Sequence, residues 1–293
     1  MFLRKVISAM ANSNTSHRRK RKRQALSVYM RRHKGSFIVY CILRAFIIMA
    51  IVLAVLQGKY ETVFMSCLAL LLFMLPAFVE RTFSIQLPSA LEIVVFCFIY
   101  AAIMLGELQS YYVKYPFWDG MLHTVNGFMC AAIGFAMVDI LNRNSRFKIE
   151  LSPFFLALVA FCFSMTVGVL WEFYEFGMDR IFHTDMQKDA IVNYISSVML
   201  DPTMSNTAVE INGINEVYIN GQPLGLGGYL DIGLIDTMKD LFVNFIGAVV
   251  FSTIGYFHAK SHGKNKLASM FIPTTDDSDK VKLLEESNEK DNK

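Results

Sequence analysis

The hydrophobic residues of this 293-residue chain are gathered into long runs separated by short polar segments. A helix rises about 1.5 Å per residue, so a run of about 20 apolar residues crosses a hydrocarbon core of about 30 Å. The pattern predicts six membrane-spanning helices, at about 36–57, 61–79, 89–106, 118–140, 154–176 and 238–258. The predicted fold class is therefore all-α: a polytopic membrane helical bundle with one extracytoplasmic loop insertion.

Basic residues are concentrated on one side of the predicted spans. Residues 1–35 hold eleven Lys and Arg side chains, the 142–150 loop holds three, and Lys260, Lys264 and Lys266 follow the last span. By the positive-inside rule, both termini are expected to be cytoplasmic, in a bacterial cytoplasmic membrane. The basic amino terminus is expected to contact anionic lipid headgroups, and a nucleic-acid partner is not expected so close to a span.

The composition divides the chain into three parts. A basic segment, 1–35, precedes a membrane domain, 36–258, and a charged tail, 259–293, is expected to be disordered. The membrane domain contains one long extramembrane loop, 177–237, which has eight acidic residues against two basic ones. The acidic excess sets this loop apart from the basic flanks of the spans.

The long loop carries local signals of secondary structure. Residues 186–200 are predicted to form a short helix. The alternating stretch 208–222 ends in Asn220-Gly221, a pair typical of a tight hairpin turn. Several glycines then predict a flexible connection to the last span.

The cysteines all lie inside the apolar runs, and none has the spacing of a thiolate metal site. They are Cys41, Cys67, Cys97, Cys130 and Cys162. We therefore expect buried free thiols that pack as small hydrophobic side chains, and neither disulfides nor a thiolate-bound metal.

Three pairs of polar residues lie near the ends of the last three predicted spans, with members three or four residues apart. These pairs are Asp119 and His123, Glu172 and Glu175, and Asp236 and Asp240. The spacing places the members of a pair on one face of a helix. Span four begins outside, span five ends outside and span six begins outside, so all three pairs are expected at a similar depth near the outer surface.

Carboxylates that share one pocket repel one another and need a metal ion, another cation or shared protons. Carboxylates with one imidazole suit Zn²⁺, Mn²⁺, Fe²⁺ or Mg²⁺. A divalent metal ion is therefore one candidate cofactor, with His123, Glu172, Glu175 and Asp240 as its candidate ligands, and another cation or shared protons remain the alternatives. Asp119 and Asp236 would complete the catalytic set of six residues.

Each of these residues also has an ordinary structural explanation when it is taken alone. Asp236 and Asp240 are suited to cap the last helix and to complement its dipole. Trp118 and Trp171 beside them are typical of an aromatic belt at a membrane interface. His183, in the long loop, is expected to be exposed.

The order of the three pairs resembles the YjdF-like bacterial integral membrane proteins, a family of unknown function. In that family an Asp and a His open one helix, a Y-E-x-x-E-like pair closes the next, and a D-T-x-x-D stretch opens the last. Here the matching residues are Asp119 and His123, Glu172-Phe173-Tyr174-Glu175, and Asp236-Thr237-Met238-Lys239-Asp240. The resemblance covers roughly residues 90–257. Where the family has Asp-Arg before the His, this chain has Asp119-Gly120, which removes one counter-charge.

The chain more distantly resembles VanZ-like membrane proteins, which are linked to the cell envelope and to glycopeptide resistance. That resemblance adds the ending D-x-x-x-N-x-x-G, here Asp240, Asn244 and Gly247. It implies an envelope-associated role rather than a particular reaction.

Three classes of function remain open from the sequence. One is a metal-dependent hydrolase or transferase acting on a lipid or envelope-precursor ligand. Another is a cation- or proton-coupled transporter or ion-binding protein, and the third is a non-catalytic structural or accessory protein. The sequence has no internal repeat of the transporter kind and no HExxH, P-loop or GxSxG motif. The position of the polar pairs close to one interface favours an envelope site.

Overall fold

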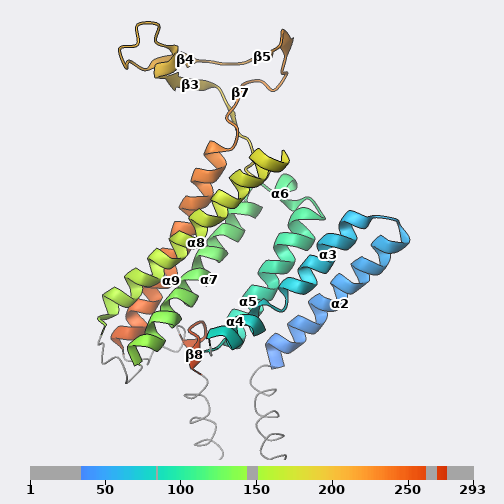
Figure 1. Cartoon of the computed structure of the whole chain (residues 1–293), viewed down its shortest axis with the longest axis vertical. Coiled ribbons are helices and arrows are strands. Elements are labelled where there is room, and N and C mark those ends of the chain that lie inside the picture. The colour runs from blue at the N-terminus through green and yellow to red at the C-terminus, as the bar shows by residue number, and fades with distance from the viewer. Residues whose placement is uncertain (1–33, 84, 144–150, 262–268, 276–293) are drawn as a thin grey trace, which may run out of the picture.

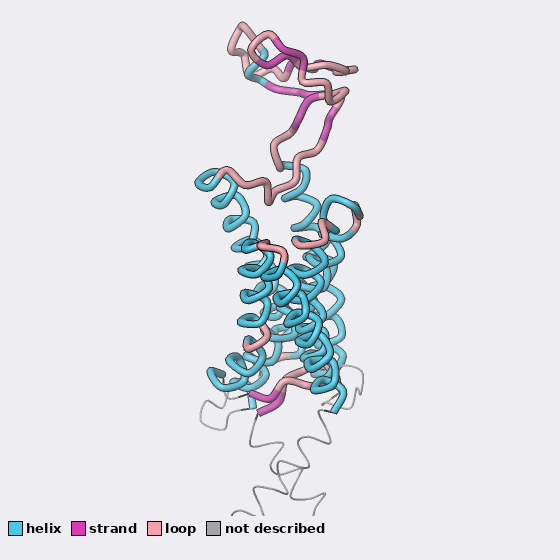
Figure 2. Tube along the Cα trace, turned by 90° about the vertical axis from the view of Figure 1, so that its right-hand side faces the viewer, coloured by secondary structure: helices cyan, strands magenta, loops and turns pink. Residues whose placement is uncertain are grey.

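The computed structural model describes residues 34–83, 85–143, 151–261 and 269–275. Within these residues, six helical segments are long and apolar enough to cross a membrane, so the predicted number of spans is confirmed. They are Lys34–Leu56, Tyr60–Thr82, Ser89–Glu107, Trp118–Asp139, Pro153–Phe182 and Leu234–Lys260. The helices stand side by side as a bundle, and the long loop projects from one end (Figures 1 and 2).

The first three spans form one half of the bundle, and two of them are composite. Their elements are α2 (Lys34–Leu56), α3 (Tyr60–Leu72), α4 (Leu75–Phe83), α5 (Ser89–Ile99), a π-helix (Tyr100–Glu107) and α6 (Tyr111–Lys114). The second span is divided between α3 and α4 at Pro76. Proline has no N–H to donate and is best tolerated in the first turn of a helix, so a new helix, α4, begins there. Ile47, Phe73 and Phe96 are buried where these spans pack.

The last three spans form the other half and pack closely along their lengths. They are α7 (Trp118–Arg143), α8 (Pro153–Phe182) and α9 (Leu234–Lys260). A Cβ atom on Gly127 would lie 2.2 Å from the Asn244 carbonyl oxygen, and one on Gly247 would lie 2.0 Å from that of Thr124. Glycines at both places therefore bring the backbones of α7 and α9 into contact, as small residues do in membrane bundles.

Two spans are longer than their apolar runs predict. Helix α8 continues to Phe182, and α9 begins at Leu234 rather than near residue 238. Asp231 explains the early start of α9, because its carboxylate accepts the backbone N–H of Ile235 and so caps the first turn. The charged residues in these extra turns depress the hydropathy that defined the predicted boundaries.

The predicted helix over 186–200 is wrong. This segment contains β2 (Ile191–Val192), β3 (Tyr194–Ser197) and a 3₁₀ turn (Val198–Leu200). Its β-branched and aromatic residues favour strands once partners are present. Strand β2 pairs with β7 (Tyr229–Leu230), and β3 pairs with β4 (Val209–Asn212), all antiparallel.

The hairpin turn at Asn220-Gly221 forms, but it joins shorter strands than predicted. It connects β5 (Tyr218–Ile219) with β6 (Gln222–Pro223). Both turn residues have positive φ, 51° and 81°, which is the conformation that an Asn-Gly turn supplies. Residues 209–212, the first part of the predicted hairpin, pair instead with β3.

The segment after α9 is packed where it is described, in contrast to the expected disorder from residue 259 onward. Strand β8 (Thr274–Thr275) pairs antiparallel with β1 (Ile85–Gln86), and Ile272 is buried beside it. The ring of Phe271 packs edge-on against Phe128 of α7, with centroids 5.2 Å apart. The rest of the predicted tail, nearly all of the basic segment 1–35 and most of the 142–150 loop lie outside the described residues.

All five cysteines are free, as predicted, but they are not buried in the protein. Four are exposed and Cys130 is half-buried. In a membrane bundle an apolar position can face lipid instead of the protein interior, so an apolar run does not predict burial within the chain.

Candidate metal centre

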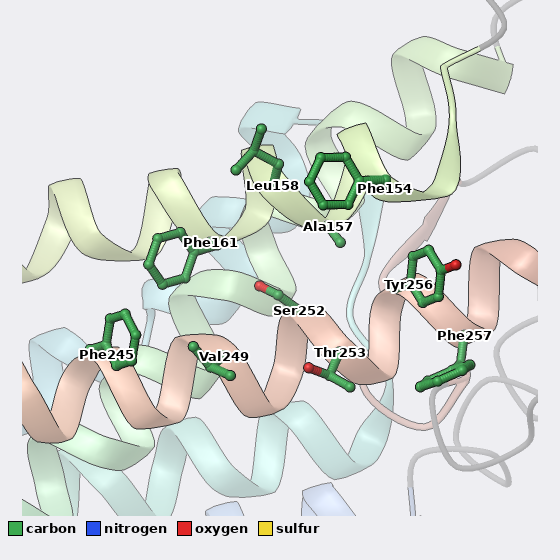
Figure 3. A pocket seen from close by; sticks show the side chains of 10 residues that line it. All are labelled: Phe154, Ala157, Leu158, Phe161, Phe245, Val249, Ser252, Thr253, Tyr256 and Phe257. Atoms are coloured by element: carbon green, nitrogen blue, oxygen red, sulfur yellow. The ribbon is translucent and has the colours of Figure 1, made fainter.

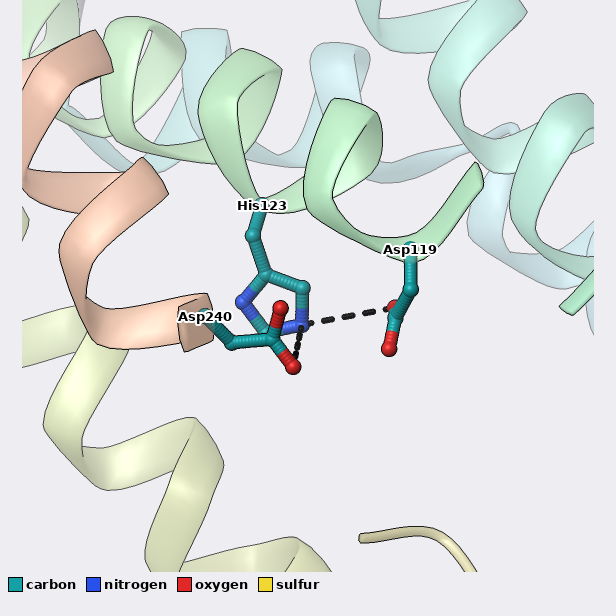
Figure 4. Close-up of side chains that lie close together, drawn as sticks. All are labelled: Asp119, His123 and Asp240. Atoms are coloured by element: carbon teal, nitrogen blue, oxygen red, sulfur yellow. Dashed lines mark ion pairs between the residues drawn. The ribbon is translucent and has the colours of Figure 1, made fainter. Parts of the chain in front are cut away.

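The bundle brings polar residues from α7, α8 and α9 together at the end that carries the long loop. Helix α7 begins at this end, α8 finishes there and α9 begins there (Figure 1). His123 lies in the second turn of α7, one turn after Asp119, and its ring points toward Asp240 of α9 (Figure 4). The predicted convergence of the three helix ends is thus present in the fold.

The imidazole of His123 lies among three carboxylates. Its Nε2 is 3.6 Å from Asp119 Oδ1 and 3.8 Å from Asp240 Oδ2, and its Nδ1 is 3.8 Å from Glu172 Oε1. All three distances exceed the 2.7–3.2 Å of ordinary hydrogen bonds. The groups are therefore close enough to interact electrostatically but leave room between them.

Two sets of metal-ligand atoms result, and His123 belongs to both. Asp119, His123 and Asp240 form one set, and His123, Glu172 and Glu175 form the other; within each set the ligand atoms lie within 4.8 Å of one another. In the second set all three residues are buried, whereas Asp119 in the first is only half-buried. Among the described residues, each set offers the His and carboxylate donors that divalent transition metals accept.

The buried carboxylates of this cluster lack ordinary partners. Glu172 is 4% exposed and Asp240 is 3% exposed. Among the described residues, neither Glu172 oxygen accepts a hydrogen bond, and Asp240 Oδ2 has none either. Within the described part of the chain, their only close ion-pairing partner is His123. Since a buried carboxylate without a partner is costly, the arrangement calls for a bound cation or a proton at this place.

Two neighbours of the cluster were not assigned to it from the sequence. Trp171, interpreted as part of an aromatic belt, donates its Nε1–H to Glu175 Oε1 at 2.8 Å and so fixes that carboxylate. Tyr112 of α6 is half-buried; burial raises the pKa of its phenol, and the Asp119 carboxylate raises it further. The i, i+4 spacing of Trp171 and Glu175 was a usable signal, whereas nothing in the sequence connects Tyr112 to the cluster.

Asn244 lies one turn below Asp240 and is completely buried between the three helices. Its Oδ1 accepts a long hydrogen bond from Asn126 Nδ2 at 3.5 Å, and its own Nδ2 lies 3.6 Å from the sulfur of Met165. Polar side chains of α9 therefore extend from the cluster, at Asp240, into the helix interface at Asn244.

Asp236 does not join either ligand set. Its Oδ2 accepts the backbone N–H of Lys188 at 2.8 Å, and the next residue, Thr237, accepts a hydrogen bond from the Gln187 side chain. Asp236 thus fastens the base of the long loop to α9. In a similar way Asp179, at the end of α8, accepts backbone N–H groups from Met186 and Gln187.

His183 is exposed, as expected from the sequence, and takes a left-handed conformation where α8 ends. It belongs to neither ligand set. It therefore offers a histidine of the same chemistry outside the cluster.

Comparison with known proteins gives a family match over most of the chain. The model of the family described as "Predicted membrane protein (DUF2238)" matches residues 38–261. An uncharacterized protein of Thermotoga maritima is 27% identical over 138 residues, which are 47% of this chain. This chain spans 65% of the length of that relative. No solved structure matches the chain.

Proposed function

This chain belongs to the predicted membrane protein family DUF2238, and from its buried histidine–carboxylate cluster we propose that it is a metal-dependent enzyme of the bacterial cell envelope. The observation that carries the proposal is the pair of ligand sets that share His123, together with the unpartnered oxygens of Glu172 and Asp240. A divalent cation would neutralise these carboxylates and give each a partner.

We assign the metal to the set of His123, Glu172 and Glu175. This set is buried throughout, and both Glu172 oxygens are free to bind. The other nitrogen of His123 then faces Asp119 and Asp240. Carboxylates in that position hold the N–H of a metal-bound imidazole and fix its orientation. Asp240 therefore becomes a positioning residue, where the sequence-based hypothesis had it as a ligand.

The protein residues supply the remaining requirements of a hydrolytic or group-transfer site. A metal ion held by His123, Glu172 and Glu175 would supply Lewis-acid chemistry for a hydrolytic or group-transfer reaction. Asp119, which is only partly buried, has the exposure to accept a proton at the more accessible side of the cluster. Trp171 holds Glu175 in place through its hydrogen bond.

The substrate class follows from the surroundings of the cluster. It lies where three apolar spans end, at the end of the bundle from which the long loop projects (Figure 1). An amphiphile, a lipid or a lipid-linked envelope precursor, can reach such a place from the membrane. The excess of basic residues near the other ends of the spans supports an outward-facing site and cytoplasmic termini.

Elemental analysis of the purified full chain tests the ligand assignment. We expect about one equivalent of a divalent metal in the wild type, and loss of it in His123→Ala and Glu172→Gln. The Asp240→Asn variant should still bind the metal, but with an affinity about 10- to 100-fold lower, because it lacks the carboxylate that holds the imidazole of His123. Added metal should raise the Tm of the wild type but not that of Glu172→Gln, because a ligand that binds only the folded state stabilises it.

His183→Ala is the matched control, since it removes an exposed histidine outside the cluster and should leave the metal content unchanged. Size-exclusion profiles show whether each variant is folded. Equal metal in the wild type and Glu172→Gln would contradict the assignment, as would a wild type that neither retains nor binds metal.

The proposed enzymatic activity is tested by mass spectrometry of envelope lipid extracts incubated with reconstituted protein. A lipid product must form with the wild type and be lost with a chelator and with Glu172→Gln.

A further inference from the structure

A groove lies between α8 and α9, toward the end of these helices that is away from the candidate metal centre. Aromatic and aliphatic side chains form its walls, among them Phe154 and Phe161 of α8 and Phe245 and Val249 of α9 (Figure 3). Its volume is about 480 Å³, within the range of small-ligand sites. The rings of Phe161 and Phe245 meet edge-on, with centroids 5.4 Å apart, at its deep end.

The groove has the length and surroundings of a site for one lipid chain. From Phe245 to Phe257 the helix rises about 18 Å, slightly more than half of a hydrocarbon core of about 30 Å. Both walls are membrane spans, and Phe154, Phe245 and Val249 are exposed on the outer surface of the bundle. A ligand in this place therefore comes from the hydrocarbon of a single leaflet.

One hydroxyl group in the groove has no partner. Ser252 is 7% exposed, and its Oγ makes no hydrogen bond among the described residues. A helical serine commonly donates to the carbonyl four residues earlier. Here the hydroxyl has no partner among the described residues and lies buried between α8 and α9 (Figure 3), so an acceptor reaches it only when side chains of the lining move aside.

A cation stands at the mouth of the groove. Lys260, exposed in the last turn of α9, places its Nζ over the ring of Tyr256, 5.6 Å from the centroid. Tyr256 lines the groove one turn after Ser252 along α9, on the side of Lys260. From Lys260 toward the middle of α9, the groove passes the hydroxyl groups of Tyr256, Thr253 and Ser252, and beyond them its lining is apolar. The phosphate, ester and hydrocarbon of a phospholipid follow one another in the same order.

We propose that this groove binds one acyl chain of an anionic phospholipid, with the Lys260 ammonium paired to the phosphate and the Ser252 hydroxyl donating to an ester carbonyl. The site is separate from the metal cluster and uses none of its residues. The groove matches the negative charge of the lipid headgroup at one end and the apolar acyl chain along the rest. A zwitterionic lipid has no net negative charge, so it should bind the groove more weakly.

Native mass spectrometry of the full chain with phosphatidylglycerol or phosphatidylcholine tests the proposal. We expect the wild type to retain one phosphatidylglycerol at least tenfold more often than phosphatidylcholine. Val249→Trp fills the groove and should abolish this retention. Lys260→Gln should remove the preference for the anionic lipid, and Ser252→Ala should weaken retention of both lipids.

Matched controls separate a defined site from the lipid that surrounds any membrane protein. Val250→Trp adds the same ring at the next position of α9, which does not line the groove, and Lys59→Gln removes an exposed lysine just before α3. Both should behave as the wild type. Unchanged retention in Val249→Trp, or no preference between the two lipids in the wild type, would overturn the proposal.

Discussion

Single residues at the α7–α9 interface decide how closely the last three spans approach. The side chain of Asn244 fills the space that Gly127 and Gly168 leave open, and a Cβ on Gly168 would lie 2.6 Å from Asn244 Nδ2. Gly247 admits the Thr124 carbonyl in the same way. The cluster around His123 lies about one turn from Asn244, so its geometry depends on this close contact.

Gly247→Ala should lower the free energy of unfolding by about 1–3 kcal/mol, the usual cost of overpacking. The new Cβ would meet backbone atoms, the Thr124 oxygen at 2.0 Å and the Phe128 nitrogen at 2.9 Å, so the helices must separate. Thermal or denaturant unfolding in detergent measures the loss. Gly177→Ala is the control: nothing lies within 4 Å of its Cβ position, so it should be neutral or stabilising by up to about 1 kcal/mol. Equal stability of the two variants would refute the close-contact explanation.

At this scale the sequence predicts part of the cluster. Helical spacing and the order of the spans were sufficient to place His123, Glu172 and Asp240 at one helix end, and the distances between them agree. Spacing gave no means of separating Asp236 from them. Its role depends on a backbone N–H of Lys188, 48 residues away along the chain, and no local pattern encodes that bond.

Among the elements, the strands of the long loop are short, and hydrogen bonds to polar side chains hold the loop in its folded conformation. Asp201 accepts hydrogen bonds from the side chains and backbone N–H groups of Thr203 and Ser205. Glu216 accepts the backbone N–H groups of Gly225 and Val217. Every one of these bonds requires a carboxylate in its ionised form to be strong.

Acid should loosen this loop before it affects the spans. The hydrogen bonds from Thr203, and then those from Ser205, hold the pKa of Asp201 well below its usual range, and the Gly225 and Val217 N–H groups lower the pKa of Glu216. A lowered folded-state pKa gives stability that is present above the unfolded value, near 4, and lost as pH falls through the folded value. The protection of the amides of residues 201–225, measured as hydrogen exchange relative to the intrinsic rate at each pH, should therefore decrease from about pH 4 downward. Asp201→Asn should exchange faster at pH 7 and show less pH dependence around 201–207; an identical profile would contradict this account.

The boundaries of the elements show why hydropathy was only partly sufficient. It identified all six spans because each needs a long apolar run. It did not detect the break before Pro76 or the π-helix Tyr100–Glu107, since both keep the apolar composition of a continuous helix. It also missed the strand pairing of 194–197 with 209–212, which is a non-local contact.

In the whole molecule, the two halves of the bundle are joined at the end away from the cluster by the segment 269–275. Strand β8 pairs with β1, which belongs to the first half, while Phe271 packs on Phe128 in the second. Ile272 lies in the core cluster between them, together with Ile85. The charged composition after residue 259 gave no sign of this contact, because its few apolar residues form no periodic pattern.

Ile272→Ala should destabilise the whole bundle by about 2–5 kcal/mol, because it leaves a cavity at a position that is 4% exposed. A lower Tm of the purified protein in detergent is the measurement. Met270→Ala, at a neighbouring position that is 50% exposed, should change the Tm little. A similar Tm for both variants would mean that this segment does not hold the halves together.

The interlocked glycines of α7 and α9 also limit how the protein can move. Sliding one helix past the other by a single residue, about 1.5 Å, would drive a side chain into a facing carbonyl group. The second half of the bundle therefore behaves mechanically as one rigid body, and any conformational cycle has to displace it as a unit against the first half. The native thiols are distributed over both halves of the bundle. Cys130 and Cys162 lie in the second half, and Cys41, Cys67 and Cys97 lie in the first half.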